Sequence, residues 1–396
     1  MSVVIVGEIP GVASVADDEQ LQETSAPITL IGYNITPIFF KAKPMSTVKR
    51  LAEEVAQGLN ELVPELNKPV VRKLSLAVGA MIEGQTPNTV ELSNLLPLDI
   101  ERQDMREQWL RRLLTSPALC CETVMAPFAQ AALKRAGKNG QVILLSMDQT
   151  DLGDRMAVLM ITVRVGDRSL PVLWQAEAGA ANIGFSTQQA LLERVLSWLP
   201  DDAPVMLLAD RFYPSVGLFN WLTAQAWQYR LRLKGNLLVD PGVGDVTTTG
   251  ELARNVTERY LPNVRLFGHG EVMTNIGILQ ETGHSEPWVI AMECAPTRAA
   301  VMDYGSRWAI EPTFSDFKSR GFELEDSQLQ HADRLERLLL IMALAMHWCV
   351  RMGQEDALLR PTPLEKKPMR RPIPCTGASK NSSAVGCPGL LEGCAT

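Results

Sequence analysis

Two patterns of hydrophobic and polar positions divide the chain near Gln141. Before it, apolar residues recur at intervals of three and four, which is typical of amphipathic helices. The clearest example is "TVKRLAEEVAQGLNELV"; in the next, "KPVVRKLSLAVGAMIEG", Pro69 suits a helix start and Gly84 a helix end. We therefore expect residues 45–138 to form an all-helical domain of short helices.

After Gln141, apolar runs alternate with amphipathic stretches. The runs "VILLSMD" and "APVMLLAD" each end in an acid and are typical of buried central strands. The segments "MAVLMITVRVG" and "SLPVLWQAEAG" indicate two strands joined by the turn "GDRS". This alternation predicts an α/β domain with a mixed sheet over residues 139–352.

Residues 236–298 break this alternation, because "EVMTNIGILQ" and "EPWVIAMECAP" indicate hairpin strands. We interpret the segment as a β-rich insertion. Residues 1–44 lack clear periodicity and are interpreted as a leader that is a candidate for disorder, with Met45 as an alternative start to Met1. Residues 353–396 are rich in Pro, Gly and Ser, which predicts a disordered tail.

The composition, 46% hydrophobic and 21% charged in 396 residues, is that of a globular protein with two or three domains. The longest apolar run, residues 338–350, is too short to span a bilayer, so we expect no membrane partner. The seven cysteines are odd in number and lack zinc-ligand spacing, and the four histidines form no cluster. These counts favour a reducing cytoplasm over a disulfide framework and make a zinc site unexpected.

The net charge of −7 alone argues against nucleic-acid binding. Phosphate contacts need only a local basic surface, so the total charge excludes little.

The stretch "YGSRWAIEPTFSDFK" places four polar residues at regular intervals in an apolar segment. On a helix their spacing would bring them onto one stripe. They are Tyr304, Arg307, Glu311 and Lys318. A salt-bridged surface face is the simpler alternative for Arg307 and Glu311, and core packing is the alternative for Tyr304. Pro312 follows Glu311 directly, so either the helix kinks there or a new helix begins.

Two of the buried strands are expected to end in carboxylates, Asp148 and Asp210. Carboxylates at the carboxyl ends of neighbouring strands lie in the crevice where α/β sheets place their sites. Together with Glu311 they would repel one another unless divalent cations such as Mg²⁺ were bound. Asp148 could instead be a turn acid, with Asp151 and Asp154 competing for its role, and Asp210 could cap the following helix.

These residues resemble those of a known family. The spacing from Tyr304 to Lys318 matches the Tyr–Arg–Glu–Lys signature of insertion-sequence-four-type DDE transposases. "MDQT" around Asp148, "LLADRFYPS" around Asp210 and "YRLRLKGN" through Lys234 are similar to further motifs of that family, over about residues 140–352. The resemblance implies a ribonuclease-H-like catalytic core with a β-rich insertion, preceded here by the helical domain, and cut-and-paste DNA transposition.

The resemblance also implies roles for individual residues. Two Mg²⁺ ions, or Mn²⁺, would be held by Asp148, Asp210 and Glu311. Phosphates near the cut would be contacted by Tyr304, Arg307, Lys318, Arg211 and Lys234. Trp288 could stack on a flipped base, with core packing as the alternative.

The expected partner is double-stranded DNA, both the element ends and the target, bound by a homodimer. Residues 45–138 would bind the ends, and the protein would work in the bacterial cytoplasm at the nucleoid. Two alternatives remain open: a ribonuclease-H-like nuclease without strand transfer, and a catalytically inactive DNA-binding protein descended from a transposase.

Overall fold

The structure is a computed structural model that describes residues 29–30, 33–34, 47–166, 168–242, 244–268, 271–281 and 283–360. Most of the expected leader and the expected tail beyond Arg360 lie outside the described residues. Two short strands, β1 (Thr29–Leu30) and β2 (Tyr33–Asn34), pair antiparallel.

The region before the sheet is helical, as the periodicity predicts. It contains α1 (Thr47–Leu62), α2 (Lys68–Gly84), α3 (Thr89–Leu95), α4 (Gln103–Leu114) and α5 (Cys121–Ala136). Pro69 lies in the first turn of α2, where a missing N–H costs no helical hydrogen bond. The same helix ends at Gly84, and the next residue, Gln85, takes a left-handed conformation that closes it.

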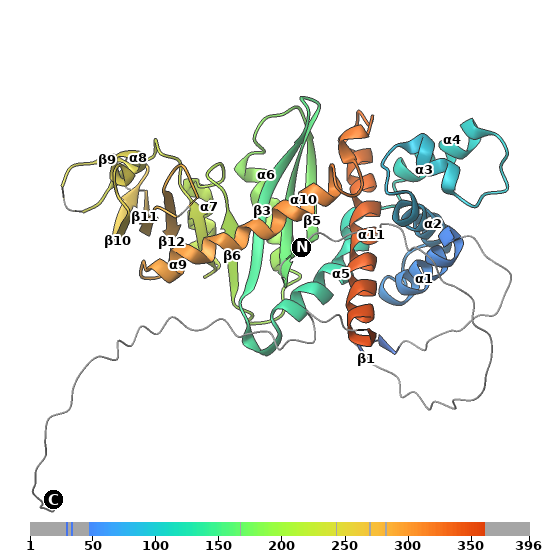
Figure 1. The fold of residues 1–396 in the computed structure, drawn as a ribbon, viewed down its shortest axis with the longest axis horizontal. Helices are drawn as coiled ribbons and strands as arrows, with labels where there is room; N and C mark the ends of the chain where they lie inside the picture. The colour runs from blue at the N-terminus through green and yellow to red at the C-terminus, as the bar shows by residue number, and fades with distance from the viewer. Residues whose placement is uncertain are drawn as a thin grey trace, which may run out of the picture. The chain divides into compact units, whose positions relative to one another are not determined.

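A ten-stranded mixed sheet follows, in the order β5-β4-β3-β6-β7-β12-β11-β10-β8-β9 (Figure 1). Its first half is formed by β3 (Ile143–Leu152), β4 (Met156–Val165), β5 (Arg168–Ala178), β6 (Val205–Ala209) and β7 (Gln228–Arg232). Its second half is formed by β8 (Leu238–Asp240), β9 (Thr247–Thr248), β10 (Glu258–Leu266), β11 (Val272–Leu279) and β12 (Trp288–Met292). β3, β6 and β7 are parallel neighbours, and the other pairs are antiparallel. The expected mixed α/β fold is confirmed.

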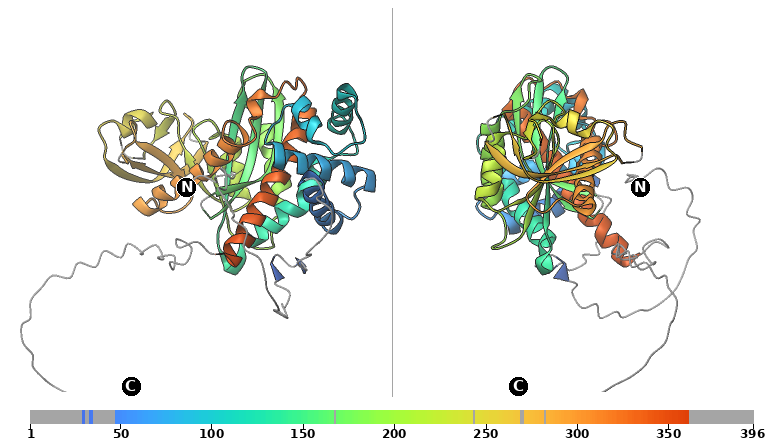
Figure 2. Two further views of the ribbon diagram at one scale, coloured as in Figure 1. Left: turned by 45° about the vertical axis from the view of Figure 1, so that its right-hand side comes forward. Right: turned by 90° about the vertical axis from the view of Figure 1, so that its left-hand side faces the viewer.

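Helices and 3-10 turns connect and cover the strands (Figures 1 and 2). They are η1 (Lys138–Gly140), α6 (Phe185–Leu196), α7 (Val216–Ala224), α8 (Thr249–Ala253), α9 (Arg298–Met302), η2 (Asp303–Ala309), α10 (Ile310–Phe317), η3 (Leu324–Asp326) and α11 (Ala332–Leu359). Helices α5, α6 and α10 pack on β5, and α9 packs on β11. Every residue of β6 is buried, which explains its uninterrupted apolar sequence.

The β-rich segment at 236–298 continues the same sheet. The two expected hairpin strands are β11 and β12, which pair antiparallel with Asn275 opposite Met292. β12 then pairs antiparallel with β7, with Ala291 opposite Leu231. The segment therefore joins the site-bearing strands through backbone hydrogen bonds.

The chain divides into two compact units, Met1–Cys349 and Val350–Thr396. The helical region and the sheet share the first unit. α11 continues to Leu359, so the prediction of disorder from residue 353 begins too early. Its last turns contain ion pairs four residues apart, such as Arg351 with Glu355, which favour helix. Within the described residues, no helix is long and apolar enough to cross a membrane.

Candidate active site

Asp148 and Asp210 occupy equivalent positions on two parallel strands. The pairing of β3 with β6 runs from Ile143 opposite Val205 to Met147 opposite Ala209, and each aspartate is the next residue. Residues in register on parallel strands point to the same face, so the two carboxylates are neighbours. Contrary to the expectation, Asp148 is not the last residue of its strand.

The strand β3 extends beyond Asp148 to Leu152 because β4 continues to pair with it, placing Asp148 opposite Met160. Only the pairing with β6 stops before the aspartate. Asp151, three residues later, points to the opposite face of the strand. The geometry therefore favours Asp148 over Asp151 as the partner of Asp210.

Asp148 is held by three hydrogen-bond donors. Arg307 donates from Nη1 to its Oδ2 at 2.8 Å. Its Oδ1 accepts from the backbone N–H of Gln149 at 3.0 Å and from the hydroxyl of Tyr213 at 3.4 Å. Burial raises the pKa of Asp148 and the charge of Asp210 adds to the rise, whereas Arg307 and the hydrogen bonds oppose it.

Asp210 lies at the start of a tight turn that follows β6. Its Oδ1 accepts from the backbone N–H of Arg211 at 2.7 Å and from the hydroxyl of Tyr304 at 3.3 Å. The helix that follows, α7, is capped by Ser215, whose hydroxyl accepts from the N–H of Leu218. Asp210 is therefore not the cap of that helix.

Arg307 links the first aspartate to the glutamate. Its Nη2 donates to Glu311 Oε1 at 3.1 Å, while Nη1 holds Asp148. The Arg307 side chain is 8% exposed, whereas that of Glu311 is 57% exposed. Burial opposes the charge on Arg307, but Tyr304 and the three carboxylates outweigh burial and raise its pKa. The pair is thus no simple surface salt bridge.

The segment that carries these residues is not one straight helix. Tyr304 and Arg307 lie on the 3-10 turn η2, where residues three apart share a face. Glu311 is the second residue of α10, and Pro312 the third, where proline is tolerated because early N–H groups have no helical partner. A new helix therefore starts near Pro312, one of the two alternatives, and the single stripe is replaced by two segments.

Lys318 lies just beyond the end of α10. Its Nζ donates to the backbone carbonyl of Asp151 at 2.9 Å and lies 3.2 Å from the carboxylate of Glu325. The lysine therefore sits beside the strand that carries Asp148.

Tyr304 belongs to a hydrophobic cluster that supports η2. The buried members are Leu279, Trp288, Ile290, Met292, Ala300, Val301 and Tyr304. The ring of Trp288, 1% exposed, contacts those of Tyr304, Trp308 and His284 at centroid distances of 5.5, 5.2 and 5.1 Å. The tryptophan proposed for base stacking is in the core here, as the alternative expectation has it, because the apolar strand β12 is buried.

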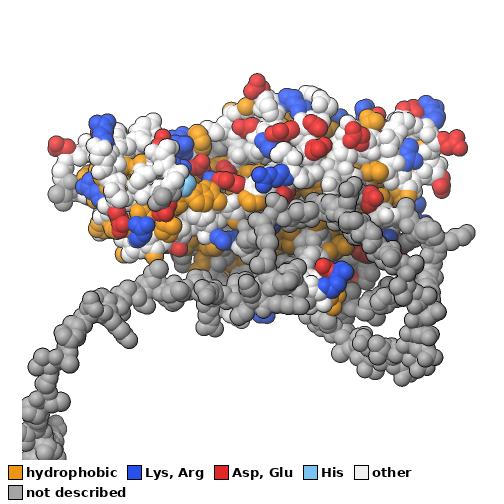
Figure 3. Space-filling view, in the orientation of Figure 1, with side chains coloured by type: hydrophobic (Ala, Val, Ile, Leu, Met, Phe, Trp, Pro, Cys, Tyr) orange, Lys and Arg blue, Asp and Glu red, His pale blue; other side chains and the backbone are white. Residues whose placement is uncertain are grey.

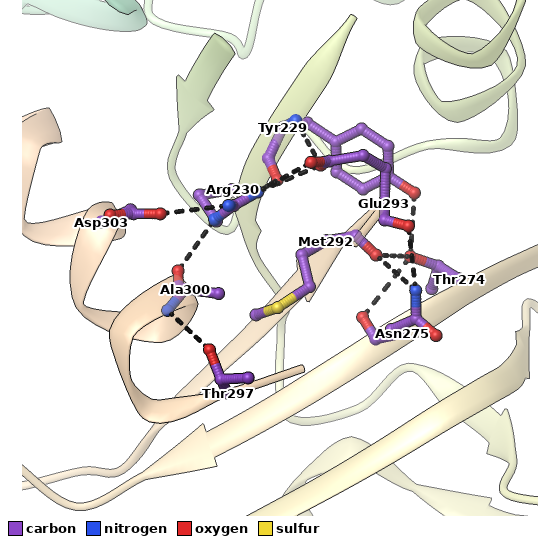
Figure 4. Close-up of polar contacts among 9 residues, drawn as sticks. All are labelled: Tyr229, Arg230, Thr274, Asn275, Met292, Glu293, Thr297, Ala300 and Asp303. Carbon is purple, nitrogen blue, oxygen red and sulfur yellow. Dashed lines mark hydrogen bonds and ion pairs between the residues drawn. The ribbon is translucent and has the colours of Figure 1, made fainter. Parts of the chain in front are cut away.

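A buried arginine bonds to residues from three segments next to this cluster, as Figure 4 shows. Arg230 on β7 is 4% exposed. It pairs with Glu293 at 3.0 Å and Asp303 at 3.1 Å, and its Nε donates to the carbonyl of Ala300 at 2.8 Å. Asp303 directly precedes Tyr304, so this network fixes the start of η2.

Sequence reasoning assigned no role to Tyr213 or Arg230. Tyr213 was visible in "LLADRFYPS", but nothing local shows that its hydroxyl returns to Asp148. Arg230 is the central residue of the strand QYRLR, and an arginine that is buried in such a position rarely lacks partners.

Three basic residues near the turn after β6 contact a carboxylate or an aromatic ring. Arg211 and Arg232 lie 3.4 and 3.7 Å from the carboxylate of Glu286. The Nζ of Lys234 lies 4.9 Å from the centre of the Phe212 ring. On the face shown in Figure 3, acidic and basic side chains are interspersed.

The donor chemistry at this site fits a hard divalent cation only in part. Carboxylate oxygens are the ligands that Mg²⁺ prefers, and Asp148 and Asp210 are neighbours. Within the described residues, however, no group of three His, Cys, Asp or Glu side chains is arranged to hold a metal ion. Arg307 bonds to both Asp148 and Glu311, so its guanidinium partly neutralises the charge that a cation would.

Comparison with protein families finds one similarity. Residues 159–348 match the family model described as "Transposase DDE domain". This match includes Asp210, Arg307 and Glu311, whereas Asp148 precedes its first residue. The chain matches no curated protein.

Solved structures give only distant similarities. Human endonuclease V is 12% identical with a TM-score of 0.24, covering 56% of this chain and 87% of its own. Its catalytic domain is 14% identical with a TM-score of 0.24, covering 60% and 97%. Argonaute of Marinitoga piezophila, in complex with a 5′-OH guide RNA and target DNA, is 9% identical with a TM-score of 0.21, covering 57% and 34%.

Proposed function

Because residues 159–348 carry a transposase DDE domain, we propose that the chain is a DNA transposase that cuts at the ends of its own element and joins them to target DNA. One observation carries the proposal: Asp148 and Asp210 follow the last registered pair of two parallel strands, and Arg307 ties the first of them to Glu311. These contacts bring three acids from distant parts of the chain together beside the carboxyl end of β6.

We assign the enzyme to the insertion-sequence-four type with a ribonuclease-H-like core. The order β5-β4-β3-β6-β7, with β3, β6 and β7 parallel, supports such a core. The placement of Tyr304 and Arg307 against Asp210 and Asp148 supports the Tyr–Arg–Glu–Lys assignment.

Asp148, Asp210 and Glu311 are the residues that would hold two Mg²⁺ or Mn²⁺ ions. When bound, such a pair polarises the phosphodiester and activates the attacking oxygen. We propose that Glu311 is the member that changes partner on metal binding, because its side chain is 57% exposed and bonds to Arg307. Release of that bond frees both Glu311 for metal and one edge of the guanidinium for phosphate.

The proposed reaction is two successive transfers at phosphorus. Water attacks the phosphodiester at the element end, the bond to the 3′ oxygen breaks, and a 3′-hydroxyl and a 5′-phosphate result. The 3′-hydroxyl then attacks a second phosphodiester, in the opposite strand or the target, and displaces its 3′ oxygen. Each step exchanges one P–O bond for another, so no external energy source is needed.

The side chains around the acids would hold the DNA backbone. Arginine offers two parallel donors to a phosphate and lysine a point charge. The proposed contacts are Tyr304, Arg307, Lys318, Arg211 and Lys234. We further propose that the helical residues 45–138 bind the double-stranded ends and that two copies of the chain act together.

Two other functions make different predictions. A nuclease without strand transfer would cut but leave the 3′ ends unjoined. A catalytically inactive DNA-binding protein would bind ends and leave them intact.

The test is a cleavage and joining assay. Purified protein is mixed with a duplex carrying the gene's own flanking DNA and a target plasmid, with Mg²⁺ or EDTA. Glu311→Gln is compared with Glu193→Gln, an exposed glutamate on α6 bonded to Gln189. We expect Mg²⁺-dependent cutting and joining that Glu311→Gln abolishes and Glu193→Gln retains. Cutting that survives Glu311→Gln, or binding without cutting, would overturn the proposal.

A further inference from the structure

Phe212 presents an exposed aromatic ring next to the acid site. It is 53% exposed, and it is the one aromatic side chain among the exposed large hydrophobic residues of the described chain. Single exposed apolar residues are ordinary on protein surfaces. The position of this ring between two residues that contact the acids sets it apart.

The turn after β6 determines where the ring points. The N–H of Tyr213 donates to the carbonyl of Asp210 at 3.2 Å, which closes a four-residue turn. The two outer residues face the site, since Asp210 accepts from Tyr304 and Tyr213 donates to Asp148. The two inner residues, Arg211 and Phe212, are exposed.

A lysine side chain lies over the ring of Phe212. Lys234, from the segment after β7, places its Nζ 4.9 Å from the ring centre, within the range of a cation–π contact. Arg211 is the neighbour of Phe212 in the chain, and Arg232 shares the partner Glu286 with Arg211. A flat ring with a cation over one face and arginines nearby suits a nucleotide, whose base can stack on the other face and whose phosphate is anionic.

We infer that Phe212 is a stacking platform for an unpaired DNA base at the mouth of the acid site, with Lys234 contacting the adjoining phosphate. The inference rests on the proposed DNA transposase function and assigns it a residue that holds a nucleotide near the cut. It places base stacking on the exposed turn, whereas Trp288 is enclosed by the core cluster. Phe212 makes no bond to the reacting phosphate and is a binding residue.

The test compares two fluorescent duplexes made from the gene's flanking DNA. One is blunt, and the other ends in four unpaired thymidines. The variants are Phe212→Ala, Phe212→Leu and Phe212→Trp, with Met273→Ala on β11 as an exposed control. Binding is measured by anisotropy in EDTA, and circular dichroism and size exclusion establish fold and oligomeric state.

Stacking on an aromatic ring predicts about a tenfold loss of affinity for the unpaired end in Phe212→Ala. Phe212→Leu should show a similar loss, because it keeps apolar volume without a flat face. Phe212→Trp should bind as wild type, blunt duplex should change less than threefold, and Met273→Ala should change neither.

Three results would overturn the inference. If wild type and Phe212→Ala bind the unpaired end with equal affinity, Phe212 is not a stacking platform, and the transposase proposal is unaffected. An altered oligomeric state in Phe212→Ala, with unchanged affinity per protomer, assigns the ring to a protein interface. Failure of wild type to bind either duplex defeats the proposed function and this inference together.

Discussion

The guanidinium of Arg307 lies 2.8 Å from the carboxylate of Asp148, although 159 residues separate the two in sequence. The arginine side chain is 8% exposed and that of the aspartate 20%. A carboxylate that is largely buried needs a cationic partner to remain ionised without a large desolvation cost. The contact therefore contributes to folding as well as to the candidate active site.

Replacing Arg307 with Gln should lower the free energy of unfolding by about 2 kcal/mol, because Asp148 loses its charged partner. Urea denaturation at neutral pH measures the change. Arg102→Gln, which removes an exposed pair with Asp104, should cost less than about 0.5 kcal/mol. The double variant Asp148→Asn/Arg307→Gln should be more stable than Arg307→Gln alone; equal stabilities would show that the pair is not coupled.

Arg230→Met should cost about 3 kcal/mol of stability, because it leaves Glu293 and Asp303 without the buried cation that joins them. Arg298→Met, which removes the pairs of a half-exposed arginine with Glu258 and Glu281, should cost clearly less. Both are measured by urea denaturation.

The conservative variant Arg230→Lys keeps the charge but loses the fork that reaches Asp303 and the carbonyl of Ala300. Where the variant is fully folded, we expect slower DNA cleavage than in wild type, because Tyr304 follows Asp303 directly. Unchanged cleavage would mean that η2 is positioned without Arg230.

Gly277→Ala should lower stability by about 2 kcal/mol, since the added Cβ would lie 2.2 Å from a methyl group of Val301 on α9. Gly305→Ala is the matched control: its Cβ would meet only Trp288 and Trp308, each at 4.0 Å, and the change should stay within about 0.5 kcal/mol. Thermal unfolding of the two variants compares them. If Gly277→Ala melts with wild type, the packing of α9 on β11 is looser than described.

His347 predicts a loss of stability at mildly acidic pH. Its ring is buried, its Nε2 lies 3.1 Å from the carbonyl of Pro171, and burial lowers its pKa below the usual 6.5. Below about pH 6.5 the unfolded chain therefore binds a proton at His347 that the folded chain does not bind. The free energy of unfolding falls as the pH drops through this range, by at most about 1.4 kcal/mol per pH unit.

His347→Gln keeps a donor for the carbonyl of Pro171 and cannot titrate. Urea denaturation between pH 7 and pH 5 should show a shallower decline in this variant than in wild type. Parallel curves would mean that folding does not lower the pKa of His347.

Periodicity in the sequence predicts much of this fold. The helices α1 to α5 follow from apolar spacing, and β6 from an uninterrupted apolar run. The expectation that Asp148 and Asp210 are neighbours follows from an acid at the end of each of two apolar runs in the sequence, although β3 continues beyond the first of them. These signals are local, because each depends on residues within one element.

The partners of the buried charges could not be predicted in this way. Arg230 meets residues 63 and 73 positions away, and no local pattern specifies either pairing. The length of β3 beyond Asp148 is set by its pairing with β4. Trp288 shows the same limit, since it packs against the rings of Tyr304 and Trp308 from the later segment η2.

The distance in sequence between Asp148 and Arg307 has a consequence for how the protein is made. A ribosome adds roughly 5–20 residues per second, so about 8–30 s pass between the synthesis of the aspartate and of the arginine 159 residues later. Once β6 has been made, it can pair with β3, but the carboxylate of Asp148 lacks its cation until Arg307 has been added. The candidate active site therefore cannot be completed before residue 307 has been made, and a chain released earlier lacks the cation that holds Asp148.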